Sequence, residues 1–114
     1  MDFTVKQIER TSIVSTNVEK LNAANASDLK AELAVLNKQN INNIVIDMSK
    51  TKYCDSSGLS AILLANRLCK DTNGKFILCG LQSNVQKLIE IAQLDRVLSI
   101  AKDQNAAMEL ISNS

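Results

Sequence analysis

The sequence predicts an α/β domain built on a mixed, mostly parallel sheet, with elements in the order β-β-α-β-α-β-α-β-α. The apolar runs at residues 44–46 and 76–79 do not alternate with polar residues, which is typical of strands buried on both faces of a parallel sheet. Segments with helical spacing separate them, so the strands are joined by right-handed crossovers. Two strand-like segments at the start add an antiparallel pair. With 114 residues, no proline and no linker-like tract, we expect one domain over residues 1–114.

The first elements are a hairpin and a helix. Residues 3–8 and 12–16 form two strands whose short link favours antiparallel pairing. A helix then begins near Asn22 or Asn25, and either asparagine can cap it. Its apolar positions keep helical spacing: Ala26, Leu29, Leu33 and Leu36.

The middle of the chain holds two strands and the longest helix. Residues 43–48 form a strand, and a helix runs from Ser57 to about Asp71. The Thr-Asn-Gly sequence at 72–74 ends this helix. Residues 76–79 form the next buried strand.

The last third contains two helices and a short strand. Ser83 and Gln86 fit a capping box at a helix start, residues 97–100 form a strand, and Asp103 caps the final helix. The apolar faces are predicted to be Val85, Leu88, Ile89 and Ala92 in the first helix, and Ala107, Leu110 and Ile111 in the second.

Composition argues against self-contained catalysis. The chain has no histidine, so it cannot hold a Ser-His-Asp or Cys-His nucleophilic system. The cysteines at 54, 69 and 79 lack zinc-ligand spacing, and glycine-rich phosphate-binding loops are absent. We therefore expect a protein that is not an enzyme and that needs no metal or cofactor.

Charge and hydropathy limit the classes of partner that this chain is expected to bind. The formal net charge is +1, no basic cluster stands out and aromatic residues are few, so direct binding to nucleic acid is not expected. No segment has the ~20 apolar residues of a membrane span. Three cysteines without a pairing pattern fit small buried side chains in a reducing cytoplasm. Cys54 differs, since a nearby helix start can lower a thiol pKa.

The junction at residues 54–58, Cys-Asp-Ser-Ser-Gly, carries the most chemistry. The Asp55 carboxylate suits an N-cap that accepts the N–H of Ser57 or Gly58. Ser57 then lies in the first turn with its hydroxyl outward, and Gly58 leaves room for a partner's active site. A helix start favours anionic groups, so Ser57 is well placed to carry a phosphoryl group. The alternative is that these residues only cap a buried helix.

Two further features have alternative interpretations. Leu59 and Leu63 fall outside the predicted core arc of the helix, which includes Leu64, so they mark a partner surface or lie under a neighbouring helix. Asp47 ends a parallel strand, where ligand sites and phosphate-accepting aspartates occur, or it is only a strand-end residue.

The motif pattern resembles the STAS domain of bacterial anti-sigma factor antagonists and sulphate transporter tails. The resemblance spans nearly the whole chain and is most specific at Asp-Ser-Ser-Gly-Leu, residues 55–59. Other matching stretches are Leu-Asn-Ala-Ala-Asn-Ala at 21–26, Ile-Asp-Met-Ser at 46–49, Leu-Cys-Gly-Leu at 78–81, Val-Gln-Lys-Leu at 85–88, Leu-Asp at 94–95 and Asp-Gln-Asn-Ala-Ala at 103–107.

The resemblance implies a regulatory binding module. In this family a serine kinase, which is itself the anti-sigma factor, phosphorylates the second serine of the motif, here Ser57. The unphosphorylated domain would bind that kinase and release a sigma factor, and a phosphatase would restore it. The resemblance and the helix pattern together give these expected partner-binding residues: Asn22, Asn25, Asp55, Ser56, Ser57, Gly58, Leu59, Ser60, Leu63 and Arg67.

Two departures from the family pattern are visible. Many antagonists have Leu-Asp where this chain has Leu-Asn22, which removes a charge near the expected docking surface. Many also have glycine where this chain has Gln93, which removes a favourable helix C-cap worth up to ~1 kcal/mol.

Two other functions remain open from the sequence. One is a STAS subunit of a membrane transporter for lipid or anions, acting through an ATPase partner. The other is a receiver-like domain that accepts phosphate on Asp47.

Overall fold

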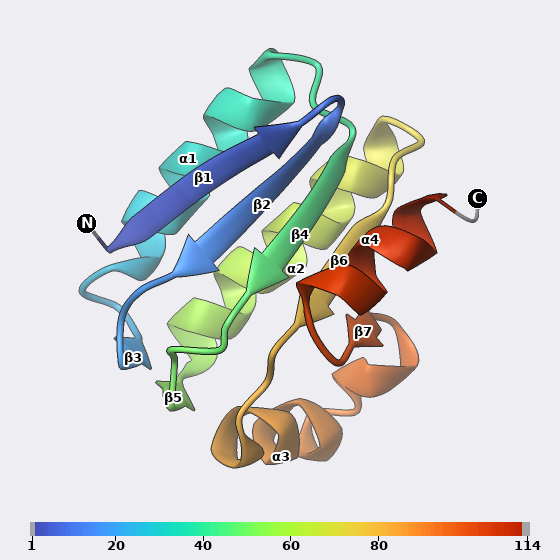
Figure 1. Cartoon of the computed structure of the whole chain (residues 1–114). Coiled ribbons are helices and arrows are strands. Elements are labelled where there is room, and N and C mark those ends of the chain that lie inside the picture. The colour runs from blue at the N-terminus through green and yellow to red at the C-terminus, as the bar shows by residue number, and fades with distance from the viewer. Residues whose placement is uncertain (1, 113–114) are drawn as a thin grey trace.

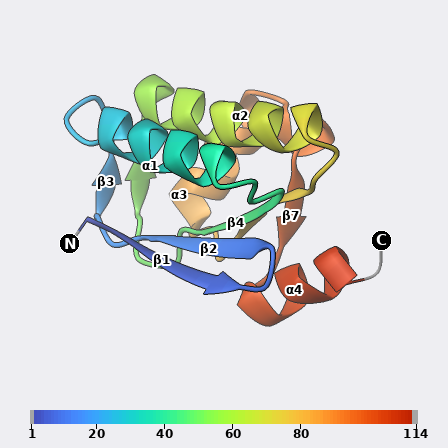
Figure 2. The same ribbon diagram turned by 90° about the horizontal axis from the view of Figure 1, so that it is seen from above.

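The computed structural model describes residues 2–112 as a central sheet with helices on both faces (Figures 1 and 2). The sheet has the order β1-β2-β4-β6-β7, with β1 (Phe3–Ile8), β2 (Thr11–Thr16), β4 (Asn43–Asp47), β6 (Phe76–Cys79) and β7 (Ser99–Ala101). The helices are α1 (Ala26–Lys38), α2 (Ser56–Asp71), α3 (Ser83–Ile91) and α4 (Gln104–Ser112), with a short 3₁₀ helix η1 (Leu94–Arg96). A separate pair of two-residue strands consists of β3 (Lys20–Leu21) and β5 (Tyr53–Cys54).

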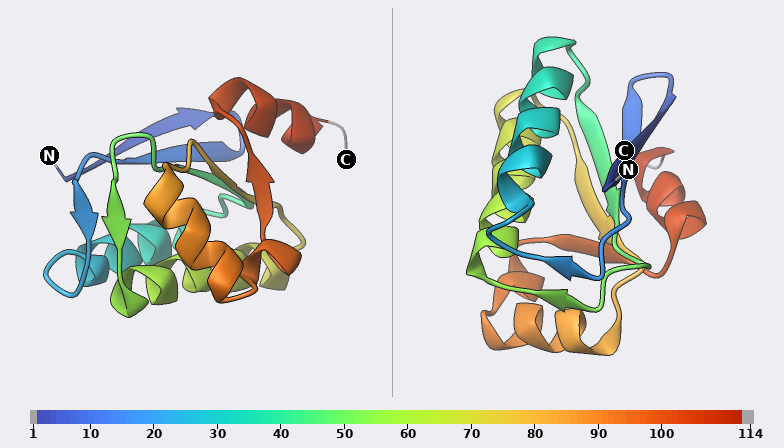
Figure 3. Two further views of the ribbon diagram at one scale, coloured as in Figure 1. Left: turned by 90° about the horizontal axis from the view of Figure 1, so that it is seen from below. Right: turned by 90° about the vertical axis from the view of Figure 1, so that its left-hand side faces the viewer.

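The sheet confirms the predicted fold class. β1 and β2 pair antiparallel, and β2, β4, β6 and β7 are parallel to one another. Successive right-handed crossovers that move in one direction across a sheet place their helices on the same face. Accordingly α1 and α2 lie side by side on one face and α4 on the other (Figure 3, right).

Alternation along the strands divides the core into two clusters. Val14, Ile46 and Leu78 face α1 and α2, where they pack with helix residues such as Leu29 and Ile62. Their neighbours face α4 in a smaller cluster made of Ile13, Val45, Ile77, Cys79 and Ala107. Both faces of the central strands are covered, which explains why their sequences do not alternate.

Helix ends agree with the sequence at some positions and differ at others. Asp103 caps α4 as predicted, since its Oδ1 accepts the N–H of Ala106 at 2.9 Å. The predicted capping box at Ser83 is wrong, because the N-cap of α3 is Gln82 and its side chain makes no capping hydrogen bond. The end of α2 lies where expected, with Thr72 as C-cap.

Other differences concern short or terminal elements. The sequence did not predict β3, β5 or η1, because two or three residues are too few for a periodic pattern. The last strand begins at Ser99, and Val97 is exposed in the preceding turn. Ala92 and Leu110, predicted to be buried, are exposed near the ends of their helices.

The carboxyl ends of β2, β4 and β6 share one edge of the sheet, and this edge positions the candidate site. The chain leaves β2 there to form β3, and it leaves β4 there to form β5 and then α2 (Figure 1). A buried hydrogen-bond cluster joins the two connections, because the Thr51 hydroxyl lies 2.7 Å from the Thr16 hydroxyl and 2.7 Å from the carbonyl oxygen of Val18, to which it donates. The β3–β5 pair and the start of α2 are therefore tied to the core.

Candidate functional site

The site begins at the N-terminus of α2. Asp55 has extended backbone and is the N-cap, and its Oδ1 accepts the Gly58 N–H at 3.1 Å, so the predicted cap is confirmed. Ser56 and Ser57 are the first two helical residues, and their backbone N–H groups have no acceptor within the helix. Two free donors and the positive end of the helix dipole therefore favour an anionic group at this position.

The two serine hydroxyls are both available there. Ser56 is exposed and Ser57 is half-buried, and neither hydroxyl makes a hydrogen bond with a residue in the described range. The Asp55 carboxylate already holds the helix start. The chain supplies a hydroxyl at an anion-stabilising position, but no histidine that would activate it.

Pairing of β3 with β5 brings two distant parts of the sequence together. Leu21 pairs with Cys54, and the Asp55 N–H donates to the Leu21 carbonyl oxygen at 3.2 Å. Asn22 thus lies beside Asp55, and both line a surface hollow of about 240 Å³. The pairing places two of the predicted partner-binding segments on one surface.

The predicted side-chain caps at Asn22 and Asn25 are wrong in detail. Asn25 occupies the N-cap position of α1, but its side chain makes no capping bond. Its Oδ1 accepts the Asn22 N–H at 3.0 Å and its Nδ2 donates to the Lys20 carbonyl oxygen at 2.9 Å. The Asn22 side chain accepts the N–H of Ala24. These bonds brace the turn between β3 and α1, since asparagine side chains bond readily to nearby backbone.

Gly58 has a different role from the one predicted. It is buried against β3 and β5, where an added Cβ would lie 2.5 Å from Cys54 Sγ and 2.7 Å from the Leu21 carbonyl oxygen. The space that a side chain would take is filled by the protein itself. Glycine at this position lets α2 approach the β3–β5 pair, rather than opening room for a partner.

The thiol beside the site is not activated. Burial, together with the smaller effect of the neighbouring Asp55 charge, raises the pKa of Cys54 from 9.0 to about 11. The expectation of a lowered pKa is wrong, because desolvation and the Asp55 carboxylate both oppose the thiolate. Burial likewise raises the pKa of Cys69 and of Cys79, to about 11 and about 12.

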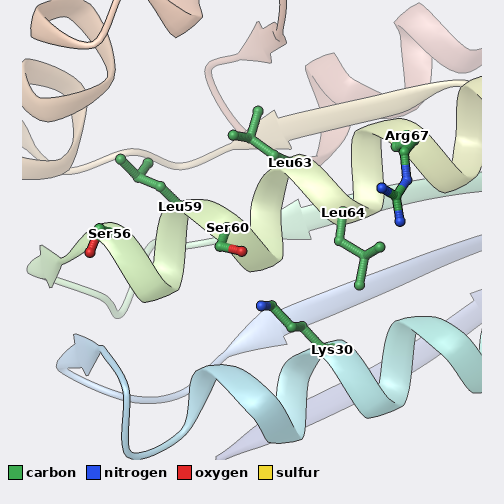
Figure 4. A pocket seen from close by; sticks show the side chains of 7 residues that line it. All are labelled: Lys30, Ser56, Leu59, Ser60, Leu63, Leu64 and Arg67. Carbon is green, nitrogen blue, oxygen red and sulfur yellow. The ribbon is translucent and has the colours of Figure 1, made fainter.

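An open groove adjoins the first turn of α2. It has a volume of about 660 Å³ and runs over α2 and the facing side of α1. In Figure 4 the Lys30 side chain extends from α1 toward Ser60 and the Leu64 side chain extends from α2 into the same space between the helices, while Leu59 and Leu63 lie on the other flank of α2. We call this surface the α1–α2 groove; its lining residues are Lys30, Ser56, Leu59, Ser60, Leu63, Leu64 and Arg67.

The structure shows which of the α2 leucines are covered by a neighbouring helix, a question that the sequence left open. Leu63 is 37% exposed, so no helix of the described chain covers it, whereas Leu59 is half-buried and packs partly on the core. Leu64, predicted to lie in the core arc, is half-buried at the groove. The sequence also missed Lys30, although right-handed crossovers through two successive helices would have indicated that α1 lies beside α2.

The comparisons with known proteins agree with this architecture. The profile of the STAS domain matches residues 2–107, which is most of the chain. This chain belongs to the STAS domain family. BtrV of Bordetella bronchiseptica, a candidate anti-sigma factor antagonist, is 31% identical over 87 residues, covering 76% of this chain and 75% of BtrV. The family predicted from the motif is therefore confirmed.

Solved structures show the same fold. A candidate anti-sigma factor antagonist of Thermotoga maritima, TM1081, is 25% identical with a TM-score of 0.90, covering 96% of this chain and 94% of its own. The anti-sigma factor antagonist SpoIIAA in its unphosphorylated form is 18% identical with a TM-score of 0.84, and the match covers 98% of this chain and 97% of SpoIIAA. The second likeness shows the fold alone.

Asp47 has a structural role in this STAS domain. Its Oδ1 accepts the Ser49 N–H at 2.9 Å and its Oδ2 accepts a hydrogen bond from Gln104 Nε2 at 2.6 Å. Gly80, with a φ of 70°, approaches the same carboxylate so closely that a Cβ would stand 2.8 Å from Oδ1. The two carboxylate oxygens thus join the end of β4 to the loop that follows it and to the first residue of α4. Membership of the STAS family removes the basis for the receiver-like interpretation.

No helix within residues 2–112 is long and apolar enough to cross a membrane. No group of three or more metal-ligating side chains occurs among these residues either.

Proposed function

We propose that this STAS domain is an anti-sigma factor antagonist that docks, while unphosphorylated, on a serine-kinase anti-sigma factor and so releases a sigma factor. Phosphorylation of Ser57 by that kinase reverses the docking, and a phosphatase restores it. The observation that carries the proposal is the Ser57 hydroxyl in the first turn of α2, without a hydrogen-bond partner in the described range and beside two free backbone donors. The similar proteins BtrV and TM1081, both candidate anti-sigma factor antagonists, support it, as does SpoIIAA, which has been solved in a phosphorylated form.

The docking surface we propose surrounds this serine. It includes the exposed part of residues 55–60, the adjoining turn at Asn22 and Asn25, and the outer face of α2 with Leu63 and Arg67. These segments meet because β3 pairs with β5, so one partner can contact all of them. The kinase supplies ATP, magnesium and the catalytic base, and this chain contributes the hydroxyl.

Phosphorylation acts on the complex more than on the fold. A phosphoserine adds about −1.5 to −2 charge, and the free N–H groups of Ser56 and Ser57 can stabilise it locally. In a close interface the same charge, next to Asp55, costs up to several kcal/mol through like-charge contacts and altered desolvation. Since ~1.4 kcal/mol changes affinity tenfold, this cost suffices to release the partner.

Phosphate mapping with matched serine variants tests the proposal. With a serine-kinase anti-sigma factor encoded near this chain, mass spectrometry should place phosphate on Ser57. Ser57→Ala should abolish phosphorylation yet still bind the kinase, whereas the matched control Ser56→Ala should still be phosphorylated. Phosphate on Ser56 or Asp47, or no binding to any such kinase, would refute it.

A phosphate mimic separates the switch from a purely structural serine. Ser57→Asp should weaken kinase binding by more than tenfold while leaving the melting temperature nearly unchanged. If Ser57→Asp instead unfolds the domain, the residue serves only packing and capping. Co-purification with an ATP-binding transport subunit, in place of a kinase, would favour the transporter alternative.

A further inference from the structure

The α1–α2 groove combines an apolar stripe with unpaired positive charge. Leu59 and Leu63 are four residues apart and form an apolar ridge along one flank of α2, while Leu64 points into the space between α2 and α1 (Figure 4). Lys30 and Arg67 line the same groove, and neither forms an ion pair with a carboxylate within the described range. None of the seven lining residues is acidic, although the chain as a whole carries nearly balanced charge.

From this juxtaposition we propose that the groove binds an acidic amphipathic helix of the partner protein. The inference rests on the proposed function and names the chemistry of the partner segment. Leucines of the incoming helix would cover the apolar ridge, and flanking glutamates or aspartates would pair with Lys30 and Arg67. An extended strand fits less well, because the groove is walled by helices and offers no free strand edge for pairing.

The dimensions suit a short helix. From Leu59 to Arg67 the surface of α2 extends about 12 Å, from the rise of ~1.5 Å per helical residue. A partner helix of about three turns would span this length and present leucines three and four residues apart.

The position of the groove also couples it to Ser57. Ser56 lines one end of the groove, so a phosphate on the next residue would stand beside the incoming helix. An acidic helix and a phosphoserine repel one another, whereas a basic helix would be attracted. An acidic occupant therefore makes phosphorylation a signal for release, as the proposed switch requires.

The direct test uses a synthetic peptide with leucines three and four residues apart and glutamate or alanine elsewhere. Titrated into the ¹⁵N-labelled full chain, it should shift the amide signals of residues 59–67 and of Lys30. A matched peptide with lysine in place of glutamate should shift them at least tenfold less at equal concentration. If neither peptide shifts these signals, or if the basic peptide does so equally, the inference is wrong.

Variants of the chain provide the controls. Lys30→Glu, Arg67→Glu and Leu63→Ser should each weaken peptide binding and kinase binding about tenfold. Lys6→Glu and Leu110→Ser make the same changes at exposed positions on the opposite face of the sheet, and should bind within twofold of wild type.

Measuring kinase binding and Ser57 phosphorylation in the same variants distinguishes the groove inference from the proposed function. If the kinase binds and phosphorylates Ser57 but tolerates all three groove variants, the groove inference fails and the proposed function stands. If no kinase acts on Ser57 while the acidic peptide still occupies the groove, the proposed function fails and the groove chemistry stands.

Discussion

Gly58→Ala is the most informative single change for the geometry of the site. Gly58 lies in the first turn of α2, and a Cβ there would stand 2.5 Å from Cys54 Sγ, 2.7 Å from the Leu21 carbonyl oxygen and 3.0 Å from Leu21 Cγ. The sulfur belongs to a side chain that can shift. The carbonyl oxygen is backbone and already accepts the Asp55 N–H, so it cannot move without disturbing the β3–β5 pair.

Two opposing contributions determine how much Gly58→Ala changes the free energy of unfolding. Replacing glycine with alanine inside a helix stabilises it by up to ~1 kcal/mol. Forcing a methyl group into a filled space costs about 1–3 kcal/mol, and here two contacts fall below the usual separation. We expect a net loss of about 1–2 kcal/mol in the free energy of unfolding.

Urea unfolding followed by circular dichroism measures the effect. Ser60→Ala, at an exposed position in the same helix, is the matched control and should be neutral or slightly stabilising. Adding Cys54→Ala should recover part of the loss, which a double-mutant cycle reports as coupling. If Gly58→Ala is as stable as wild type, the close approach of α2 to β3 and β5 is refuted.

Three further predictions concern backbone, polar packing and thiol chemistry. Gln93 has a left-handed backbone with φ of 59°, so Gln93→Gly should raise the free energy of unfolding by about 0.5–1 kcal/mol, and a loss in urea unfolding would contradict this. Thr51→Val should lower it by about 1–3 kcal/mol, because the Val18 carbonyl oxygen and the Thr16 hydroxyl lose a buried partner; an unchanged urea midpoint would argue against that network. The rate at which iodoacetamide alkylates Cys54 should rise with pH and show its inflection near pH 11, and an inflection below pH 9 would contradict the burial argument. Because the thiol of the unfolded chain ionises near pH 9.0, the contribution of Cys54 to the free energy of unfolding is fully present below that pH and falls as the pH rises toward 11.

The sequence alone determined the fold class, most element positions and the chemistry of the α2 start. Buried strands without alternation at 44–46 and 76–79, joined by helical segments, predict a parallel sheet with few alternatives. The Asp55 cap was predictable as well, since capping depends on residues three apart in the sequence. Such features follow from local periodicity and local hydrogen bonding.

Only the tertiary structure decided how the site is assembled. The β3–β5 pair joins Leu21 to Cys54 across more than thirty residues, and two-residue strands leave no periodic signal. The same pairing assigned Gly58 to close packing and raised the pKa of Cys54, because both effects depend on which atoms fill the space around them. The groove likewise needed α1 beside α2 to bring Lys30 opposite α2, since contact across a sheet face is set by topology and packing rather than by neighbours in the sequence.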